Sequence, residues 1–203
     1  MRAVAARLWA EGVDGLYTFN WYTQQRLRRT LLAQIGSAAA LQCATKTYIS
    51  TVRLRRAAGS GFAGIDDQDR IYGEVPVELH PTVSEIGPTI CWRVVDDAPA
   101  AAAAGQLSGI TLRLHLENWS NLDLLSVNYD GRALEERVVR FPQSLDENTT
   151  GEVGKVAWIE YALAPAAGAP GNHIVQVSLR RRNPDLSGPL VLLDVDLEIN
   201  YHE

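Results

Sequence analysis

Residues 109–131, GITLRLHLENWSNLDLLSVNYDG, decide the fold of this chain. Apolar and polar residues alternate over positions 110–117, which is the period-two pattern of a strand with one buried face. After the polar segment 118–121, positions 122–129 are predicted to form a second strand, and Asp130-Gly131 is a turn dipeptide. Two strands are not stable alone in water, so segments on both sides must cover them. We therefore predict a β-sandwich with these strands near its middle.

Composition places the chain among soluble globular proteins. It has 203 residues, of which 46% are hydrophobic and 21% charged, and this length suits one large or two modest domains. The formal net charge of −5 does not favour nucleic acid as a partner. Arginines cluster at positions 26–29, 53–56 and 180–182, and clusters this short are typical of solvated faces rather than anion sites.

The two cysteines, Cys43 and Cys91, have no metal-binding spacing, and we expect two buried free thiols rather than a disulfide. No run approaches the roughly 18 apolar residues of a membrane span, so no membrane association is expected. No signal peptide is evident after Met1. The cytoplasm is therefore the default localisation, although a chain that had lost its natural N-terminus would look the same.

The predicted elements are mainly helices in the first 47 residues and mainly strands in the rest of the chain. Residues 2–11 have helical spacing, 16–19 are predicted to form a buried strand, and 23–35 return to helical spacing before a short helix that Ser37 caps. Short strands separated by turn residues then follow at 48–54, 75–79, 89–95, 138–141, 156–162, 173–179, 190–195 and 197–201. We predict a mainly β chain: a helix–strand–helix segment over 1–47 and a jelly-roll-like β-sandwich domain over 48–203.

Two stretches also resemble a known group of proteins. WAEGVDGLYTFNW (residues 9–21) resembles the last barrel strand and its preceding helix in bacterial TIM-barrel proteins related to glycoside hydrolases, and ATKTY (44–48) resembles the exit from their closing helix. Residues 122–131, 171–177 and 192–201 look like the C-terminal β-sandwich of the same proteins, which is similar to galactose-binding-like jelly rolls. The resemblance implies a remnant of a (β/α)8 barrel followed by an accessory module.

Catalysis by this chain alone is not expected. A TIM barrel needs eight strand–helix units in roughly 250 residues, and this sequence has room for one. Glycoside hydrolysis needs two carboxylates that flank the scissile bond, whereas the barrel-like strand ends in Asn20-Trp21-Tyr22. Three hypotheses remain: a non-catalytic accessory module with weak carbohydrate binding, a part of a hydrolase whose barrel is completed elsewhere, and a structural or oligomerising sandwich.

Two groups of residues are candidates for carbohydrate binding. Asn20, Trp21 and Tyr22 lie where a barrel's substrate cleft would open; alternatively, Trp21 packs against the next helix. Asn118, Trp119 and Asn121 lie in the loop between the two central strands, where an aromatic ring among amides suits a sugar; alternatively, Trp119 folds over the open end of the sandwich. Two further tryptophans lie within predicted strands and are expected in the core: Trp92 and Trp158.

No catalytic residue, metal or cofactor is expected. Asp66, Asp67 and Asp69 could supply oxygen ligands to calcium, but the segment lacks the later glutamate of an EF-hand, which favours a solvated loop. The four histidines have no short metal spacing. We expect carbohydrate as a partner, and self-association or a partner chain through residues 1–47, because the apolar strand 16–19 has no parallel neighbour in the chain.

Overall fold

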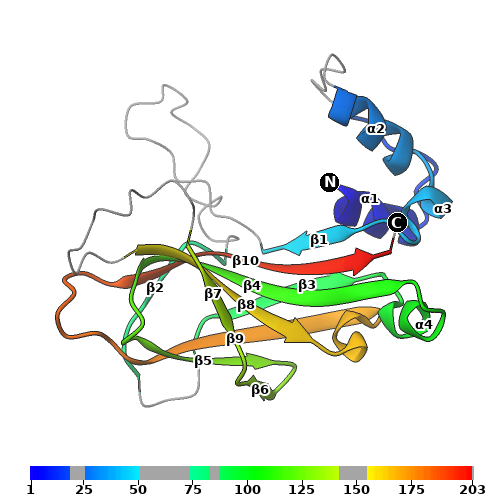
Figure 1. Cartoon of the computed structure of the whole chain (residues 1–203). Helices are drawn as coiled ribbons and strands as arrows, with labels where there is room; N and C mark the ends of the chain where they lie inside the picture. The colour runs from blue at the N-terminus through cyan, green and yellow to red at the C-terminus, as the bar shows by residue number, and fades with distance from the viewer. Residues whose placement is uncertain (19–25, 51–73, 83–86, 142–154, 203) are drawn as a thin grey trace, which may run out of the picture.

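The computed structural model describes residues 1–18, 26–50, 74–82, 87–141 and 155–202, and this part of the chain forms two antiparallel sheets with a few helices (Figure 1). The larger sheet has the order β1-β10-β4-β8-β7, with β2 also paired to β10. Its strands are β1 (Lys46–Ile49), β2 (Val77–Leu79), β4 (Leu107–Trp119), β7 (Val138–Arg140), β8 (Lys155–Leu163) and β10 (Leu190–Tyr201).

The smaller sheet has the order β3-β9-β5-β6. Its strands are β3 (Thr89–Val94), β5 (Leu124–Tyr129), β6 (Arg132–Leu134) and β9 (Gly171–Arg181). The turn between β5 and β6 is the predicted Asp130-Gly131, and both residues have positive φ, 49° and 76°. That backbone suits a tight hairpin, so this prediction is confirmed.

Both sheets contribute to one hydrophobic core. The predicted alternation in β4 is confirmed, because Ile110, Leu112, Leu114 and Leu116 are all buried. The same cluster contains side chains from the smaller sheet, including Val175 of β9. The mainly β fold class predicted from the sequence is therefore confirmed.

The two central strands belong to different sheets: β4 pairs with β8 and β10, whereas β5 pairs with β6 and β9. The segment between β4 and β5 thus crosses from one sheet to the other. One further detail differs from the sequence prediction: residues 190–201 form one strand with an irregularity between Leu192 and Asp194. The segment after β3 forms a short helix, α4 (Ala98–Ala103), whose first turn is capped by the Asp97 carboxylate.

The N-terminal helices are α1 (Arg2–Ala10), α2 (Arg26–Ile35) and α3 (Ala38–Leu41), which agrees with the predicted helices where the structure describes them. They share a small second core of Ala5, Ile35 and Leu41, on which Leu16 packs. Residues 16–18 are not in a strand, so that part of the prediction is wrong: with no neighbouring strand to pair with, Leu16 is covered by helices instead. Residue 19 lies outside the described residues.

α1 lies against β1 at the edge of the larger sheet, and α2 and α3 pack on α1 (Figure 1). Ala3 of α1 belongs to the core of the two sheets, and the Arg2 guanidinium donates to the carbonyl of Thr45 at 3.1 Å. The predicted domain boundary at 47/48 falls inside β1, since Lys46 and Thr47 pair with β10. Self-association through residues 1–47 stays a prediction.

Cys43 and Cys91 are free thiols, as predicted, but both are exposed, so the expectation of buried thiols is wrong. In β3 the residues on either side of Cys91, Ile90 and Trp92, face the core, and the period of two turns Cys91 outward. Among the described helices, none has the length and apolar character needed to cross a membrane.

Candidate functional site

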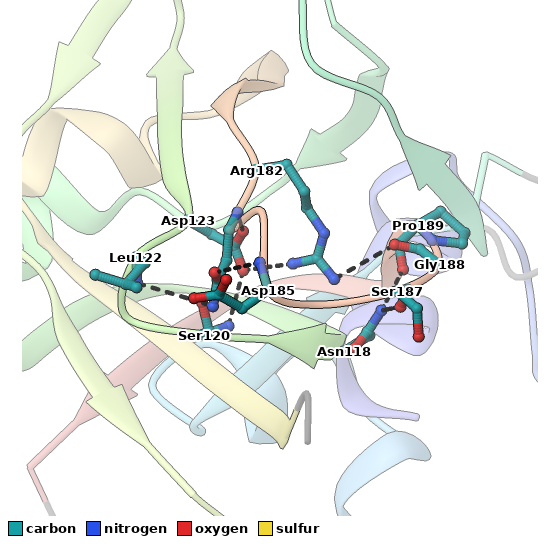
Figure 2. A network of polar contacts seen from close by, with 10 residues as sticks. Asn118, Ser120, Leu122, Asp123, Arg182, Asp185, Ser187, Gly188 and Pro189 are labelled. Atoms are coloured by element: carbon teal, nitrogen blue, oxygen red, sulfur yellow. Dashed lines mark hydrogen bonds and ion pairs between the residues drawn. The ribbon is translucent and has the colours of Figure 1, made fainter. Parts of the chain in front are cut away.

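The loop predicted to bind carbohydrate follows β4, and Figure 2 shows its contacts. Trp119 is 1% exposed and belongs to the main core, so neither face of its ring can receive a sugar in this conformation. The Asn118 side-chain amide donates to the carbonyls of Ser187 and Pro189, each at 3.0 Å. Asn121 is exposed. The loop therefore presents a polar side chain without the aromatic platform that motivated the prediction.

A buried carboxylate holds this loop in place. Asp123 Oδ2 accepts from the backbone N–H of Ser120 at 2.8 Å and from Arg182 at 2.6 Å. Its Oδ1 accepts from the backbone N–H of Asn183 at 2.7 Å (Figure 2). Ser120 lies between β4 and β5, whereas Arg182 and Asn183 lie between β9 and β10. Asp123 therefore ties these two connections together. Arg182, from one of the arginine clusters, thus neutralises a buried charge inside the protein.

The two tryptophans expected in the core lie in different environments. Trp92 is 6% exposed and belongs to the main core, so its prediction is confirmed. The prediction for Trp158 is wrong: its neighbours Ala157 and Ile159 are both fully buried, and Trp158 lies on the outward face of the larger sheet, partly exposed. The alternation was readable in the sequence, because Glu160 shares the face of Trp158.

Trp158 forms an aromatic pair with His115 of the neighbouring strand β4. The two residues are direct cross-strand partners, and their rings stack with centroids 4.3 Å apart and planes 5° from parallel. The Arg113 guanidinium carbon lies 5.4 Å from the centre of the Trp158 ring, within range of a cation–π contact. We call this part of the outward face the sheet platform; it consists of Arg113, His115, Arg140, Trp158, Glu160, Asp196 and Glu198.

The charged groups of the sheet platform hold one another. Arg113 donates to both oxygens of Asp196, at 2.7 and 3.1 Å, and lies 3.3 Å from Glu198. Arg140 donates to Glu160 at 2.6 Å. The bidentate contact with Asp196 fixes the Arg113 guanidinium in one orientation. The platform is therefore a preformed set of hydrogen-bonding groups around an aromatic pair.

Burial changes the acid–base behaviour of this face. It lowers the pKa of His115, against the opposing effect of Asp194, Asp196 and Glu117, and so favours the neutral imidazole. The hydrogen bond with Asp196 raises the pKa of Arg113. A neutral imidazole offers one hydrogen-bond donor and one acceptor.

A second polar cluster joins the larger sheet to the segment that follows β3 of the smaller sheet. β1 places Lys46 and Tyr48 on one face, and both donate to Asp96, at 2.6 and 2.5 Å. The Tyr201 hydroxyl donates to Asp96 at 2.6 Å. Burial, with the nearby Asp96 charge, raises the pKa of both tyrosines, so their hydroxyls stay protonated as donors. This Asp96 cluster, made of Lys46, Tyr48, Asp96 and Tyr201, gives a structural role to the lysine and tyrosine of the ATKTY segment.

Above the Asp96 cluster lies a hollow of about 390 Å³, which we call the junction pocket. Its walls are α1 and α3, which contribute mainly alanine side chains and Trp9. Lys46 and Asp96 also line it, as do the more exposed Gln42 and Asp97. Its volume is within the range of small-molecule sites.

The described residues do not offer the carboxylate pair of a glycosidase in an open cleft. The buried carboxylates Asp96, Asp123 and Asp196 are each paired with a lysine or an arginine. No group of three metal-ligating side chains is found in the part of the chain that the structure describes. The candidates Asn20, Trp21 and Tyr22, and the possible calcium ligands at 66–69, lie outside the described residues.

Comparison with known proteins identifies no family for this chain. No protein-family model matches the chain, and no curated protein sequence matches it. The assignment of a function therefore depends on the geometry of its own surface.

Proposed function

We propose that this chain is a non-catalytic accessory module, a jelly-roll-like β-sandwich that binds carbohydrate through the sheet platform. The observation that carries the proposal is the partly exposed, stacked pair of His115 and Trp158 among fixed hydrogen-bonding groups. The loop at 118–121, where sequence analysis expected binding, is the weaker candidate because Trp119 is buried.

The chemistry of the sheet platform suits a sugar. An indole ring packs against the apolar C–H face of a pyranose, while carboxylates accept hydrogen bonds from hydroxyl groups and guanidinium groups donate to them. Because Arg113 is already held by Asp196 and Glu198, little of its side-chain freedom is lost when a ligand binds.

The link to a glycoside-hydrolase-like protein is part of the same proposal. It is supported by the resemblance of residues 9–21 and 122–131 to the end of a barrel and its accessory sandwich. The reading as an accessory module is favoured over a catalytic fragment because the buried carboxylates of the described residues are committed to structural ion pairs.

Affinity electrophoresis in gels that contain neutral, basic or acidic polysaccharides tests this proposal. We expect retardation of the parent protein in at least one gel, and its loss in Trp158→Ala. Ile174→Ala, an exposed apolar residue on the smaller sheet, is the matched control and should be retarded like the parent. Equal retardation of Trp158→Ala and the parent would refute the sheet platform, as would an equal loss in Ile174→Ala.

A further inference from the structure

The junction pocket has the size of a small-molecule site and lies beside a buried ion pair. Its volume is about 390 Å³. The side chains of Lys46 and Asp96 are each 2% exposed and hold each other, so the polar groups that a ligand can reach belong to the more exposed lining residues.

One wall of the junction pocket is a fixed aromatic ring. The Trp9 indole N–H donates to the carbonyl of Ile35 at 2.8 Å, which holds the ring in one orientation. The facing wall from α3 carries the short side chains of Ala38 and Ala39, so the hollow between the helices stays open.

The other end of the pocket carries hydrogen-bonding groups. Lys46 donates to the carbonyl of Ala44 at 3.0 Å and to Asp96 at 2.6 Å. The same Nζ lies 5.1 Å from the centre of the Tyr201 ring, so the ammonium group is held by partners inside the protein. Gln42 and Asp97 add an amide and a carboxylate to the lining. The Lys46 charge is balanced by Asp96, and Asp97 makes this set of groups negative, which disfavours an anionic ligand.

We propose that the junction pocket binds one neutral sugar residue, such as the end of a glycan chain, with the ring against Trp9 and its hydroxyls on Gln42 and Asp97. The choice of a sugar rests on the carbohydrate binding proposed above. The pocket is separate from the sheet platform: it is lined by α1, α3, Lys46 and the segment after β3, whereas the platform lies on β4, β7, β8 and β10. An exposed sheet face suits the middle of a glycan chain, whereas a hollow between helices suits its end.

Filling the pocket is the sharpest test. Ala38 is exposed and lines the pocket, so Ala38→Leu should occupy its volume without removing a hydrogen bond. Ala40→Leu is the matched control, since Ala40 is in the same helix, is equally exposed and faces a different hollow. The probes are methyl β-D-glucopyranoside and methyl β-D-galactopyranoside, titrated while the indole N–H resonance of Trp9 is followed by NMR.

We expect a saturable shift of the Trp9 resonance with at least one of these glycosides. Affinity should fall about tenfold or more in Ala38→Leu and stay unchanged in Ala40→Leu. No shift at Trp9, equal binding by Ala38→Leu, or equal loss in Ala40→Leu would each overturn the pocket. If one of these results is found but the parent is still retarded in polysaccharide gels through Trp158, only the proposal for the junction pocket is refuted. If retardation in the gels is absent as well, the proposed carbohydrate binding by the sheet platform is also refuted.

Discussion

Lys46 and Asp96 form an ion pair inside the protein: Nζ of Lys46 lies 2.6 Å from Oδ1 of Asp96, and neither side chain reaches solvent appreciably. The pair joins the first strand of the larger sheet to the segment that follows β3 of the smaller sheet. The hydroxyl groups of Tyr48 and Tyr201 also donate hydrogen bonds to the Asp96 carboxylate. The first and last strands of the larger sheet and the segment after β3 thus meet at one carboxylate.

Removing one partner of this pair should strongly destabilise the protein. Lys46→Met leaves the Asp96 charge buried without its cation, and we expect the free energy of unfolding to fall by about 3–5 kcal/mol. Urea unfolding followed by circular dichroism measures this. The control is Arg93→Gln, which removes the exposed contact with Glu11 at 3.6 Å and should cost no more than about 1 kcal/mol. Similar small losses for both variants would contradict a buried, solvent-free pair.

Alanine variants of Trp119 and Trp158 should differ in their effects: the first should lower stability, and the second should abolish binding. Trp119→Ala removes a fully buried side chain and is expected to cost about 3–5 kcal/mol. Trp158→Ala removes a partly exposed ring and should cost less while abolishing retardation in polysaccharide gels. Thermal melts and affinity gels on both variants check this. The assignment fails if Trp119→Ala melts like the parent.

Gly87 should not tolerate alanine. A Cβ atom at this position would lie 1.8 Å from the carbonyl oxygen of Val177, which is backbone and cannot turn away. The segment before β3 would have to leave β9, and the hydrogen bond from the Val177 N–H to Pro88 would be lost. We expect a large drop in melting temperature for Gly87→Ala and little change for Gly109→Ala, whose Cβ meets no atom within 4 Å. Equal melting temperatures of these two variants would show that the backbones do not approach this closely.

Stability should fall at alkaline pH. Burial raises the pKa of four tyrosines, Tyr48, Tyr129, Tyr161 and Tyr201. Above the ordinary tyrosine pKa of about 10, the unfolded chain releases these protons while the folded protein keeps them. The folded state then binds more protons, so the free energy of unfolding decreases by about 1.4 kcal/mol per pH unit for each tyrosine.

Urea unfolding at pH values below and above about 10 measures this slope. Tyr161→Phe removes one of the four hydroxyls and should make the slope shallower than in the parent. A free energy of unfolding that stays constant through this range would mean that the tyrosines are accessible to water.

Local patterns in the sequence predicted much of the fold. The alternation at 110–117 identified the buried face of β4, and Asp130-Gly131 identified the hairpin turn, because both signals come from neighbouring residues. The assignment of β4 and β5 to different sheets was not predictable in this way. It depends on pairings such as Arg113 with Asp196, which are far apart in sequence.

The candidate sites were harder to predict for the same reason. Trp119 looked accessible because it is flanked by polar residues, yet its side chain points into the core while its neighbours bond the β9–β10 connection. No sequence pattern indicated the role of Asp96, since a single aspartate after a strand belongs to no repeating pattern. Its hydrogen-bond partners are 48 to 105 residues away in the sequence. Trp158 was predictable from the alternation of its own strand.

The long strand β10 has both β1 and β2 along one side, at Ile199–Asp196 and Leu192–Leu190 respectively. Two short strands from distant parts of the chain thus cover backbone groups that would otherwise recruit a strand from another molecule. A protein shortened to begin after β1 would expose the N–H and C=O groups of residues 196–199, on a strand in which buried Leu197 and Ile199 alternate with Asp196 and Glu198. Such a truncation is expected to form insoluble aggregates rather than a smaller working module, so any dissection of this chain should keep Lys46–Ile49 with the sheets.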